Sequence, residues 1–267
     1  MRRRFARAVP GLALAWALPA TTIAAQAAAP GDWPAYGRDP GGSRYSPLAQ
    51  LTPANVNRLE RAWVHRTGDL LAGRGRFQST PIMVDGTLYL SSPLGRVSAL
   101  DPATGRERWT FDPGVRLDGD YGDFANRGVS TWLDPTRAAG ASCRRRIYIA
   151  TIDARLIALD GATGRPCADF GAGGTVYLGR ELDLPPAYAG EYQVTSPPAV
   201  VGDLVIVGSA IADNQRTDAP SGVVRAYEAR TGRLRWRWDP IPRSPADSAW
   251  TTWTDGRGAP AGRRTGG

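Results

Sequence analysis

The chain has 267 residues, of which 42% are apolar and 22% charged, enough for one or two domains with a packed core, which excludes a disordered chain. Its 32 glycines and 22 prolines favour many short strands and turns over long helices. The formal charge is +8, but every basic residue is arginine, four of them lie among the first seven residues, and the rest are interspersed with acids. We therefore expect no nucleic-acid partner.

Residues 1–27 read as a signal peptide. An arginine cluster precedes an apolar run from Val9 to Ala25, and Ala25-Gln26-Ala27 supplies the small residues of a cleavage site. A retained membrane anchor is the alternative, but the run is rich in alanine and broken by two prolines, so it would span a bilayer poorly. We expect an exported, periplasmic protein, free or membrane-associated, with no transmembrane span in the mature chain.

Residues 28–60 form an N-terminal segment, and 61–267 carry a repeat. Each copy predicts a strand, a turn, a strand, an acid-x-x-Thr-Gly turn and a further strand, and the copies lie at 84–109, 146–165 and 201–236. The acid can accept hydrogen bonds from the amides two or three residues on, and the glycine supplies the positive φ that reverses the chain. Glu228 replaces the aspartate in the third copy, where we expect weaker capping.

Repeated sheets that cannot bury both faces alone predict an all-β fold, a β-propeller whose blades pack on one another around an axis. Two tryptophans that follow the turns, Trp109 and Trp236, would be covered by such stacking. A β-sandwich with long loops is the alternative, but it needs no repeat. Two inserts lengthen the repeats, 114–142 and 171–193, and inserts of this size commonly carry function on one face.

The chain has two cysteines, Cys143 and Cys167. If the protein is exported, an oxidising compartment favours a disulfide between them. A metal site would need more ligands nearby, and the only histidine, His65, lies in an alternating pattern typical of a strand surface. We expect a structural disulfide.

Five motifs occur in order along the chain: Asp-Trp-Pro-Ala-Tyr-Gly-Arg-Asp at 32–39, Phe-Gln-Ser-Thr-Pro at 77–81, Asn-Arg-Gly-Val at 126–129, Thr-Ser-Pro-Pro at 195–198 and Gly-Ser-Ala-Ile-Ala-Asp-Asn at 208–214. Over residues 32–255 the chain resembles the quinoprotein dehydrogenases, eight-bladed β-propellers that carry pyrroloquinoline quinone (PQQ). The resemblance is strongest to the glucose dehydrogenase branch, through Ala212-Asp213-Asn214 and the Pro-Ser-Gly-Val-Val-Arg run at 220–225.

This resemblance implies a site for PQQ and calcium. Gln78, Arg127 and Thr195 resemble the positions that hydrogen-bond the cofactor; Asp213 resembles a calcium ligand, with Asn214 beside it as a further oxygen donor. PQQ is a flat quinone with three carboxylates, so cations and hydrogen-bond donors suit it, and calcium prefers hard oxygen ligands.

Each of these residues also has a purely structural explanation. The Asp-Asn pair is a common turn, Arg127 could pair with Asp123, Thr195 could begin a strand, and Gln78 could be an ordinary strand residue. Their joint occurrence in order favours the site.

The implied function is oxidation of a glucose-like sugar or an alcohol by hydride transfer to the quinone, with electrons passed to a respiratory quinone or a cytochrome. In the family the proton-abstracting aspartate lies in later blades, so we expect no catalytic residue within 1–267, about three blades of the ring, and no turnover by this fragment alone. The alternative is a non-catalytic propeller scaffold of the outer-membrane assembly type, which would not need Arg127 and the Asp-Asn pair together.

Overall fold

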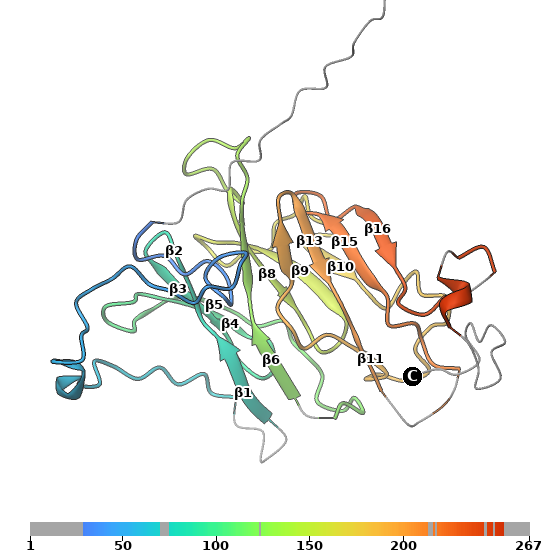
Figure 1. Cartoon of the computed structure of the whole chain (residues 1–267), viewed down its shortest axis with the longest axis horizontal. Coiled ribbons are helices and arrows are strands. Elements are labelled where there is room, and N and C mark those ends of the chain that lie inside the picture. The colour runs from blue at the N-terminus through green and yellow to red at the C-terminus, as the bar shows by residue number, and fades with distance from the viewer. Residues whose placement is uncertain are drawn as a thin grey trace, which may run out of the picture.

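The structure is a computed structural model that describes residues 29–69, 75–122, 124–212, 216, 218–242, 245–247 and 249–253. Among these residues the regular structure is almost entirely β (Figure 1). The only helical elements described are two single 3-10 turns, η1 (Val56–Arg58) and η2 (Trp250–Thr252). No described helix is long and apolar enough to cross a membrane.

Three four-stranded antiparallel sheets follow one another along the chain (Figure 1). The first contains β2 (Ile82–Val84), β3 (Thr87–Ser91), β4 (Val97–Leu100) and β5 (Glu107–Phe111); the second contains β7 (Ser130–Leu133), β8 (Arg145–Ala150), β9 (Arg155–Asp160) and β10 (Thr175–Tyr177); the third contains β12 (Ala199–Val201), β13 (Leu204–Val207), β15 (Val224–Glu228) and β16 (Leu234–Trp238). These sheets are the blades of a partial β-propeller, as the repeat predicts.

Four further strands lie outside the blades. β1 (Gly75–Thr80) pairs in parallel with β6 (Phe124–Gly128), and β11 (Tyr192–Gln193) pairs antiparallel with β14 (Ala210–Ile211). β1, β6 and β11 lie along the lower edge of the molecule in the view of Figure 1.

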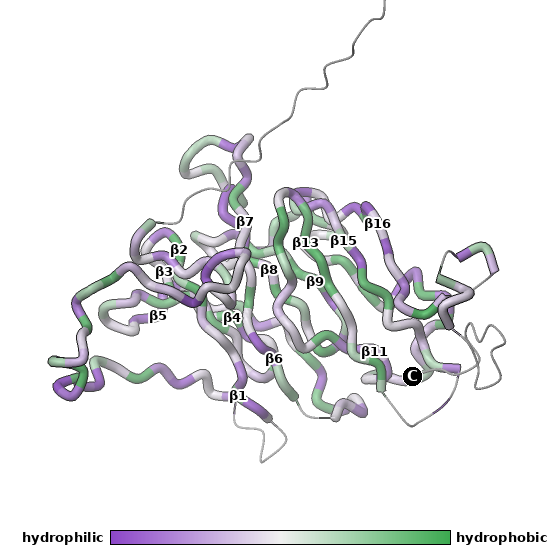
Figure 2. The backbone as a smooth tube through the Cα atoms, viewed as in Figure 1, coloured by the Kyte–Doolittle hydropathy of each residue, from purple (hydrophilic) through white to green (hydrophobic). Residues whose placement is uncertain are grey.

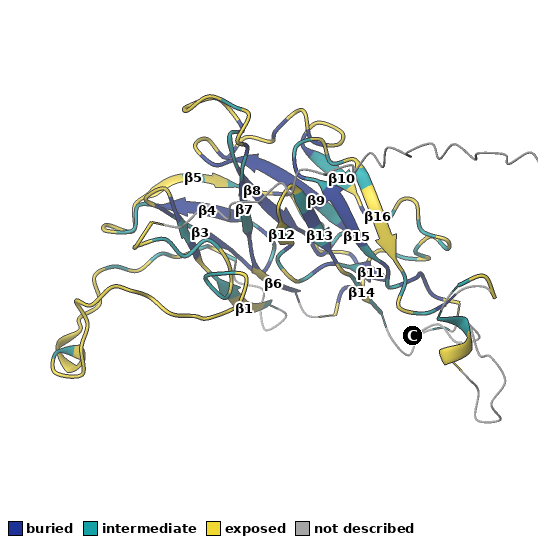
Figure 3. Ribbon diagram, turned by 45° about the horizontal axis from the view of Figure 1, so that its top comes forward, coloured by how far each residue is buried: buried dark blue, intermediate teal, exposed yellow. Residues whose placement is uncertain are grey.

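The core lies between the blades, as the alternation of side chains along β8 illustrates. Ile147 and Ile149 belong to the cluster shared with the first blade, whereas Tyr148 and Ala150 belong to the cluster shared with the third. Because both faces are covered, the second part of β8, residues 147–150, is a continuous apolar run, as expected for a buried strand. Figures 2 and 3 show this apolar and buried centre, with the outer strand β16 exposed.

The acid-x-x-Thr-Gly turns have the predicted chemistry. The carboxylate of Asp101 accepts hydrogen bonds from the amides of Ala103 (3.1 Å) and Thr104 (3.0 Å). Asp160 makes the equivalent bonds in the second blade. Glu228 makes no such bond to the amides of its turn and instead pairs with Arg233, which confirms the weaker capping of the third copy.

Two tryptophans pack on turns of the blades: Trp109, on the outer strand β5 of the first blade, packs on the turn of the second, and Trp63, outside any assigned strand, packs on the turn of the first. A Cβ built on Gly164 would lie 2.5 Å from the ring of Trp109, and one on Gly105 would lie 2.5 Å from the ring of Trp63. Each indole N–H also donates to a carbonyl of the same turn. The predicted covering is confirmed for Trp109, whereas Trp236 remains 40% exposed.

The structure adds strands that the sequence analysis did not predict, and it corrects the strand predicted around His65. The first insert contains strands, because β6 and the inner strand β7 of the second blade lie within 114–142; the second contains β10 and β11. The sequence gives no hairpin signal for β7 because the loop 134–144 joins it to β8, where the other two blades use the tight turns Asp85-Gly86 and Gly202-Asp203. His65 lies in an extended segment to which no strand is assigned.

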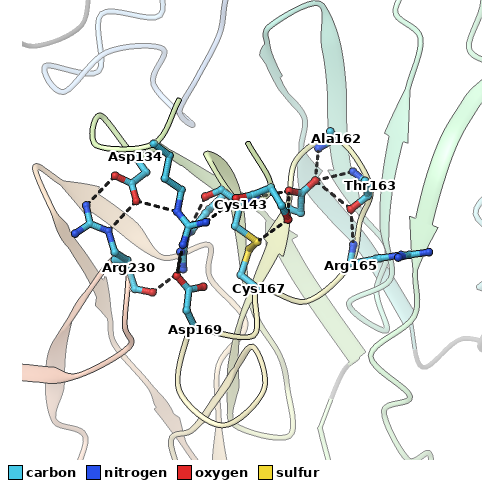
Figure 4. The surroundings of a disulfide bond; sticks show 12 residues. Asp134, Cys143, Ala162, Thr163, Arg165, Cys167, Asp169 and Arg230 are labelled. Carbon is cyan, nitrogen blue, oxygen red and sulfur yellow. Dashed lines mark hydrogen bonds and ion pairs between the residues drawn. A yellow bond between two sulfur atoms is a disulfide. The ribbon is translucent and has the colours of Figure 1, made fainter. Parts of the chain in front are cut away.

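The predicted disulfide between Cys143 and Cys167 is present (Figure 4). It joins the loop after β7 to the segment that follows the turn of the second blade. The same region holds a charge network: Asp134 pairs with Arg230, and the fully buried Arg146 pairs with Asp169. Since Arg230 belongs to the third blade, this network ties the second blade to the third.

Candidate functional site

The three predicted cofactor-binding residues that the structure describes lie at one end of the blades. Strand direction alternates within each antiparallel sheet, so the loops between the second and third strands share an end with the segments that lead from one blade to the next. Among the described residues, the former are 92–96, 151–154 and 208–223 without 213–215 and 217, and the latter are 112–129 without 123, and 178–198. Gln78, Arg127 and Thr195 all belong to segments that lead into a blade.

Strand β6 positions Arg127. Its neighbour Asn126 is buried, accepts a hydrogen bond from Ser91 (2.7 Å) and donates one to the carbonyl of Ala150 (2.8 Å). These bonds fix β6 against the first two blades and leave the side chain of Arg127 exposed. Asn126 belongs to one of the sequence motifs, but the sequence alone did not indicate its role. A buried amide that bridges distant segments has no local sequence signal.

Arg127 and Thr195 meet in the structure, although 68 residues separate them. The guanidinium of Arg127 donates to the Thr195 hydroxyl at 2.5 Å, and the Arg127 amide donates to the Thr195 carbonyl at 2.9 Å. Thr195 is half-buried and lies outside any strand, so the strand-start explanation for it does not hold. Two contacts at one pair of residues hold the guanidinium in a defined direction.

Gln78 lies on β1, next to the strand that carries Arg127. Phe77 pairs with Asn126 and Thr80 with Gly128, and the register shifts between these two pairs. Gln78 is exposed and lies in this irregular stretch, opposite the position of Arg127. A donor side chain and a cation therefore lie on adjacent strands at the same edge.

Arg127 forms no ion pair with any carboxylate of the described residues. The alternative partner proposed from the sequence, Asp123, lies outside the described residues. An exposed guanidinium that bonds only to a neutral hydroxyl retains most of its five donors for an external acceptor. This arrangement suits an anionic ligand such as a polycarboxylate.

The predicted calcium ligand Asp213 and its neighbour Asn214 lie outside the described residues. The described residues on either side of them both bond to Glu191: Ala212 donates its amide to the Glu191 carbonyl (2.9 Å), and Arg216 donates to the Glu191 carboxylate (2.5 Å). Glu191 is fully buried, and the Arg216 guanidinium holds its pKa below the usual range despite that burial. Nothing in its sequence context marks Glu191 for this role.

No cluster of three or more histidine, cysteine, aspartate or glutamate side chains that could hold a metal ion occurs among the described residues. Gln78, Arg127 and Thr195 are the described donors that could bind PQQ. A cation and two neutral groups capable of donating match a planar quinone with carboxylates.

A family model and individual relatives of known function all match this chain to quinoprotein dehydrogenases. The family described as the glucose/ethanol/alcohol dehydrogenase β-propeller domain (PQQ) matches residues 33–262. Quinoprotein glucose dehydrogenase A of Acinetobacter calcoaceticus is 38% identical over 83% of this chain and 29% of its own length. The quinate/shikimate dehydrogenase (quinone) of Acinetobacter baylyi is 40% identical over 80% of this chain and 28% of its own length.

Solved structures agree with this comparison. A quinohemoprotein alcohol dehydrogenase of Pseudomonas putida superposes with a TM-score of 0.63 at 31% identity, covering 86% of this chain and 29% of that one. A europium-containing methanol dehydrogenase superposes with a TM-score of 0.61 at 26% identity, covering 85% of this chain and 34% of that one. The chain spans less than a third of the length of the curated relatives it matches.

Proposed function

Because this chain belongs to the PQQ β-propeller family of glucose, ethanol and alcohol dehydrogenases, we propose that it forms part of a quinoprotein dehydrogenase that oxidises a sugar or an alcohol. PQQ, when bound, supplies a hydride-accepting quinone. The observation that carries the proposal is the exposed guanidinium of Arg127, held by Thr195 beside Gln78 and without a described carboxylate partner.

In this proposal the chain's own residues bind and orient the cofactor. The guanidinium of Arg127 donates to a carboxylate or quinone oxygen, and the hydroxyl of Thr195, which accepts from Arg127, keeps its own proton for a second acceptor. Gln78 adds an amide donor from the adjacent strand. None of these residues is assigned the proton transfer from substrate.

Substitution of Arg127 tests the proposal directly. Arg127→Ala should weaken PQQ binding by about 10–100-fold, because one charge-assisted contact is worth about 1.5–3 kcal/mol, and Arg127→Lys should restore part of the loss. Titration calorimetry with PQQ measures the affinity without turnover, and dye reduction with a sugar and alcohol panel should show no turnover, because we expect the proton-abstracting aspartate in later blades. Arg165→Ala, at an exposed arginine in a turn at the opposite end of the blades, is the matched control. Equal PQQ affinity in Arg127→Ala and the control would refute the site.

We further propose that Asp213 binds a calcium ion and that Asn214 contacts the cofactor. The europium-containing methanol dehydrogenase among the structural relatives supports a metal ion in this family. Asp213→Ala should abolish tight calcium binding, measured by calorimetry on the protein, and the calcium requirement for PQQ reconstitution. Unchanged calcium affinity would assign the pair to a structural turn.

Export to the periplasm, a respiratory quinone or cytochrome as electron acceptor, and a glucose-like substrate remain parts of the proposal. The disulfide supports an oxidising compartment, and glucose dehydrogenases among the relatives support the sugar. Sequencing the N-terminus of exported protein tests cleavage after residue 27, and an intact Met1 end would contradict it. The scaffold alternative has no observation in its favour, because the matching family is that of the dehydrogenases.

A further inference from the structure

The two inserts meet and line an open cavity of about 290 Å³ that the proposed PQQ site does not use. The lining side chains with aromatic or charged groups come from both inserts and from the second blade. They are Tyr121, Asp153, Tyr177, Arg180, Tyr188 and Tyr192. Four of the eleven lining residues are tyrosines, so aromatic rings form a substantial part of the walls.

The contact between the inserts is built into the backbone. The amide of Asp120 donates to the carbonyl of Ala189 at 3.0 Å. Gly190 follows with a φ of +106°, and a Cβ at this position would lie 2.3 Å from the Asp120 carbonyl oxygen. Only glycine permits this approach, so the cavity is a defined feature of the fold.

The cavity offers hydrogen-bond donors. The hydroxyls of Tyr121, Tyr177 and Tyr188 make no hydrogen bond to any described residue. The guanidinium of Arg180 lies 4.5 Å from the centre of the Tyr177 ring and forms no ion pair with a described carboxylate. Arg180 and Tyr177 are both exposed to solvent and therefore reachable by a ligand.

The acceptors around the cavity are already used. Asp153 contributes the only carboxylate among the described lining residues, and it is bonded to Arg155 (2.6 Å) and to the Thr151 hydroxyl (2.5 Å). On the other side Arg225, 2% exposed, donates to the Tyr192 hydroxyl at 2.7 Å and has no carboxylate within ion-pair distance among the described residues. The described residues around the cavity therefore offer more unbonded donors than unbonded acceptors, and the positive charges of Arg180 and Arg225 have no described carboxylate partner.

We propose that this cavity binds a planar ring molecule that carries hydrogen-bond-accepting oxygens, the chemistry shared by a benzoquinone and an aromatic carboxylate. Tyrosine faces and the stacked guanidinium suit a flat ring, and the phenol and guanidinium N–H and O–H groups suit carbonyl or carboxylate oxygens. The volume lies near the lower limit of about 300 Å³ for small-molecule pockets, which fits a single ring. For a quinone, the inference rests on the proposed function and gives the proposed quinone acceptor a place in the fold; for an aromatic carboxylate it goes beyond that function, and in neither case does it depend on PQQ.

Titration calorimetry on the full chain, without PQQ or metal, tests the inference with two probes, a water-soluble dimethoxy-methyl benzoquinone and benzoate. We expect at least one probe to bind, and Tyr177→Ala and Arg180→Ala each to weaken that binding about tenfold, a loss of about 1.4 kcal/mol. Arg180→Ala should weaken benzoate more than the quinone, because benzoate is charged. Tyr45→Ala and Arg165→Ala remove exposed side chains of the same types elsewhere and should leave the affinity unchanged.

The outcomes separate the two sources of the ligand chemistry. Binding of the quinone alone assigns the cavity to quinones, and binding of benzoate alone assigns it to aromatic carboxylates; either supports the inference if the Tyr177 and Arg180 substitutions weaken it. Tyr177→Phe, which keeps the ring, should lose less affinity than Tyr177→Ala. Absence of binding by both probes, or binding that survives both substitutions in variants with unchanged far-ultraviolet circular dichroism, overturns the inference. No readout involves turnover, so failure of the dehydrogenase proposal would leave this result intact.

Discussion

Replacing Asp134 with asparagine should loosen the contact between the second and third blades. Asp134 is fully buried, and its two oxygens each accept a hydrogen bond from the Arg230 guanidinium at 2.7 Å (Figure 4). The hydroxyl and amide of Thr136 donate to one of the same oxygens. Asparagine keeps the shape but removes the charge, so the guanidinium loses its partner on the neighbouring blade.

The magnitude follows from the burial of the pair. Breaking a buried ion pair costs about 3–5 kcal/mol, because the remaining charge stays desolvated. Arg230 is 36% exposed, so solvent screens its charge and we expect about 2–3 kcal/mol. For a chain of this size, a loss of 1 kcal/mol in unfolding free energy lowers the unfolding temperature by about 2–4 °C. The substitution should therefore lower it by about 4–12 °C.

Thermal unfolding followed by circular dichroism measures this loss. Asp118→Asn is the matched control, because Asp118 pairs with Arg116 and both side chains are largely exposed, 64% and 81%. Its substitution should cost less than about 1 kcal/mol. Equal shifts for the two variants, or no shift for Asp134→Asn, would refute the role of the buried pair.

The same carboxylate makes stability depend on pH. The hydrogen bonds from Arg230 hold the pKa of Asp134 well below its usual range, although burial acts in the opposite direction. The unfolded chain therefore takes up a proton first as the pH falls through about 4. The stabilisation is complete above that pH and is lost progressively towards the folded pKa. When the pH is lowered from about 5 to about 2, the unfolding free energy of the unsubstituted protein should fall more than that of the Asp134→Asn variant.

Two further perturbations test the packing between blades and the disulfide within the second blade. Gly164→Ala should destabilise the protein more than Gly86→Ala, because both glycines have positive φ but only the Cβ at Gly164 would meet the ring of Trp109; equal losses of unfolding free energy in urea would contradict the packing. Reducing the Cys143–Cys167 disulfide should cost about 3 kcal/mol in the chain-entropy model. Alkylation without reductant should add no mass to the native protein, and two modified thiols would contradict the bridge.

The blades were predictable because their signals are local. An aspartate, a threonine and a glycine within five residues define each of the first two turns, and the structure shows the hydrogen bonds that this spacing predicts. Strand β7 was missed because its connection to β8 is long, and the hairpin rule needs a short turn. Local chemistry therefore accounts for the repeat but not for its full length.

The site was predictable only in part. Motifs resembling the family identified Arg127 and Thr195 separately, and only the fold brings them together. The supporting bonds of Asn126 and the tyrosine cavity depend on segments that are distant in sequence, such as Asp120 and Gly190. Contacts of this kind are set by how blades stack, which no spacing in the sequence encodes.

The tryptophan contact between blades has a consequence for synthesis on the ribosome. Trp109 precedes by 55 residues the glycine that its ring covers, Gly164. At a synthesis rate of about 5–20 residues per second, about 3–11 s pass between the synthesis of Trp109 and that of the turn on which its ring packs. The first blade therefore emerges with this aromatic side chain temporarily uncovered. During that interval the nascent chain offers chaperones an aromatic surface that the finished protein conceals.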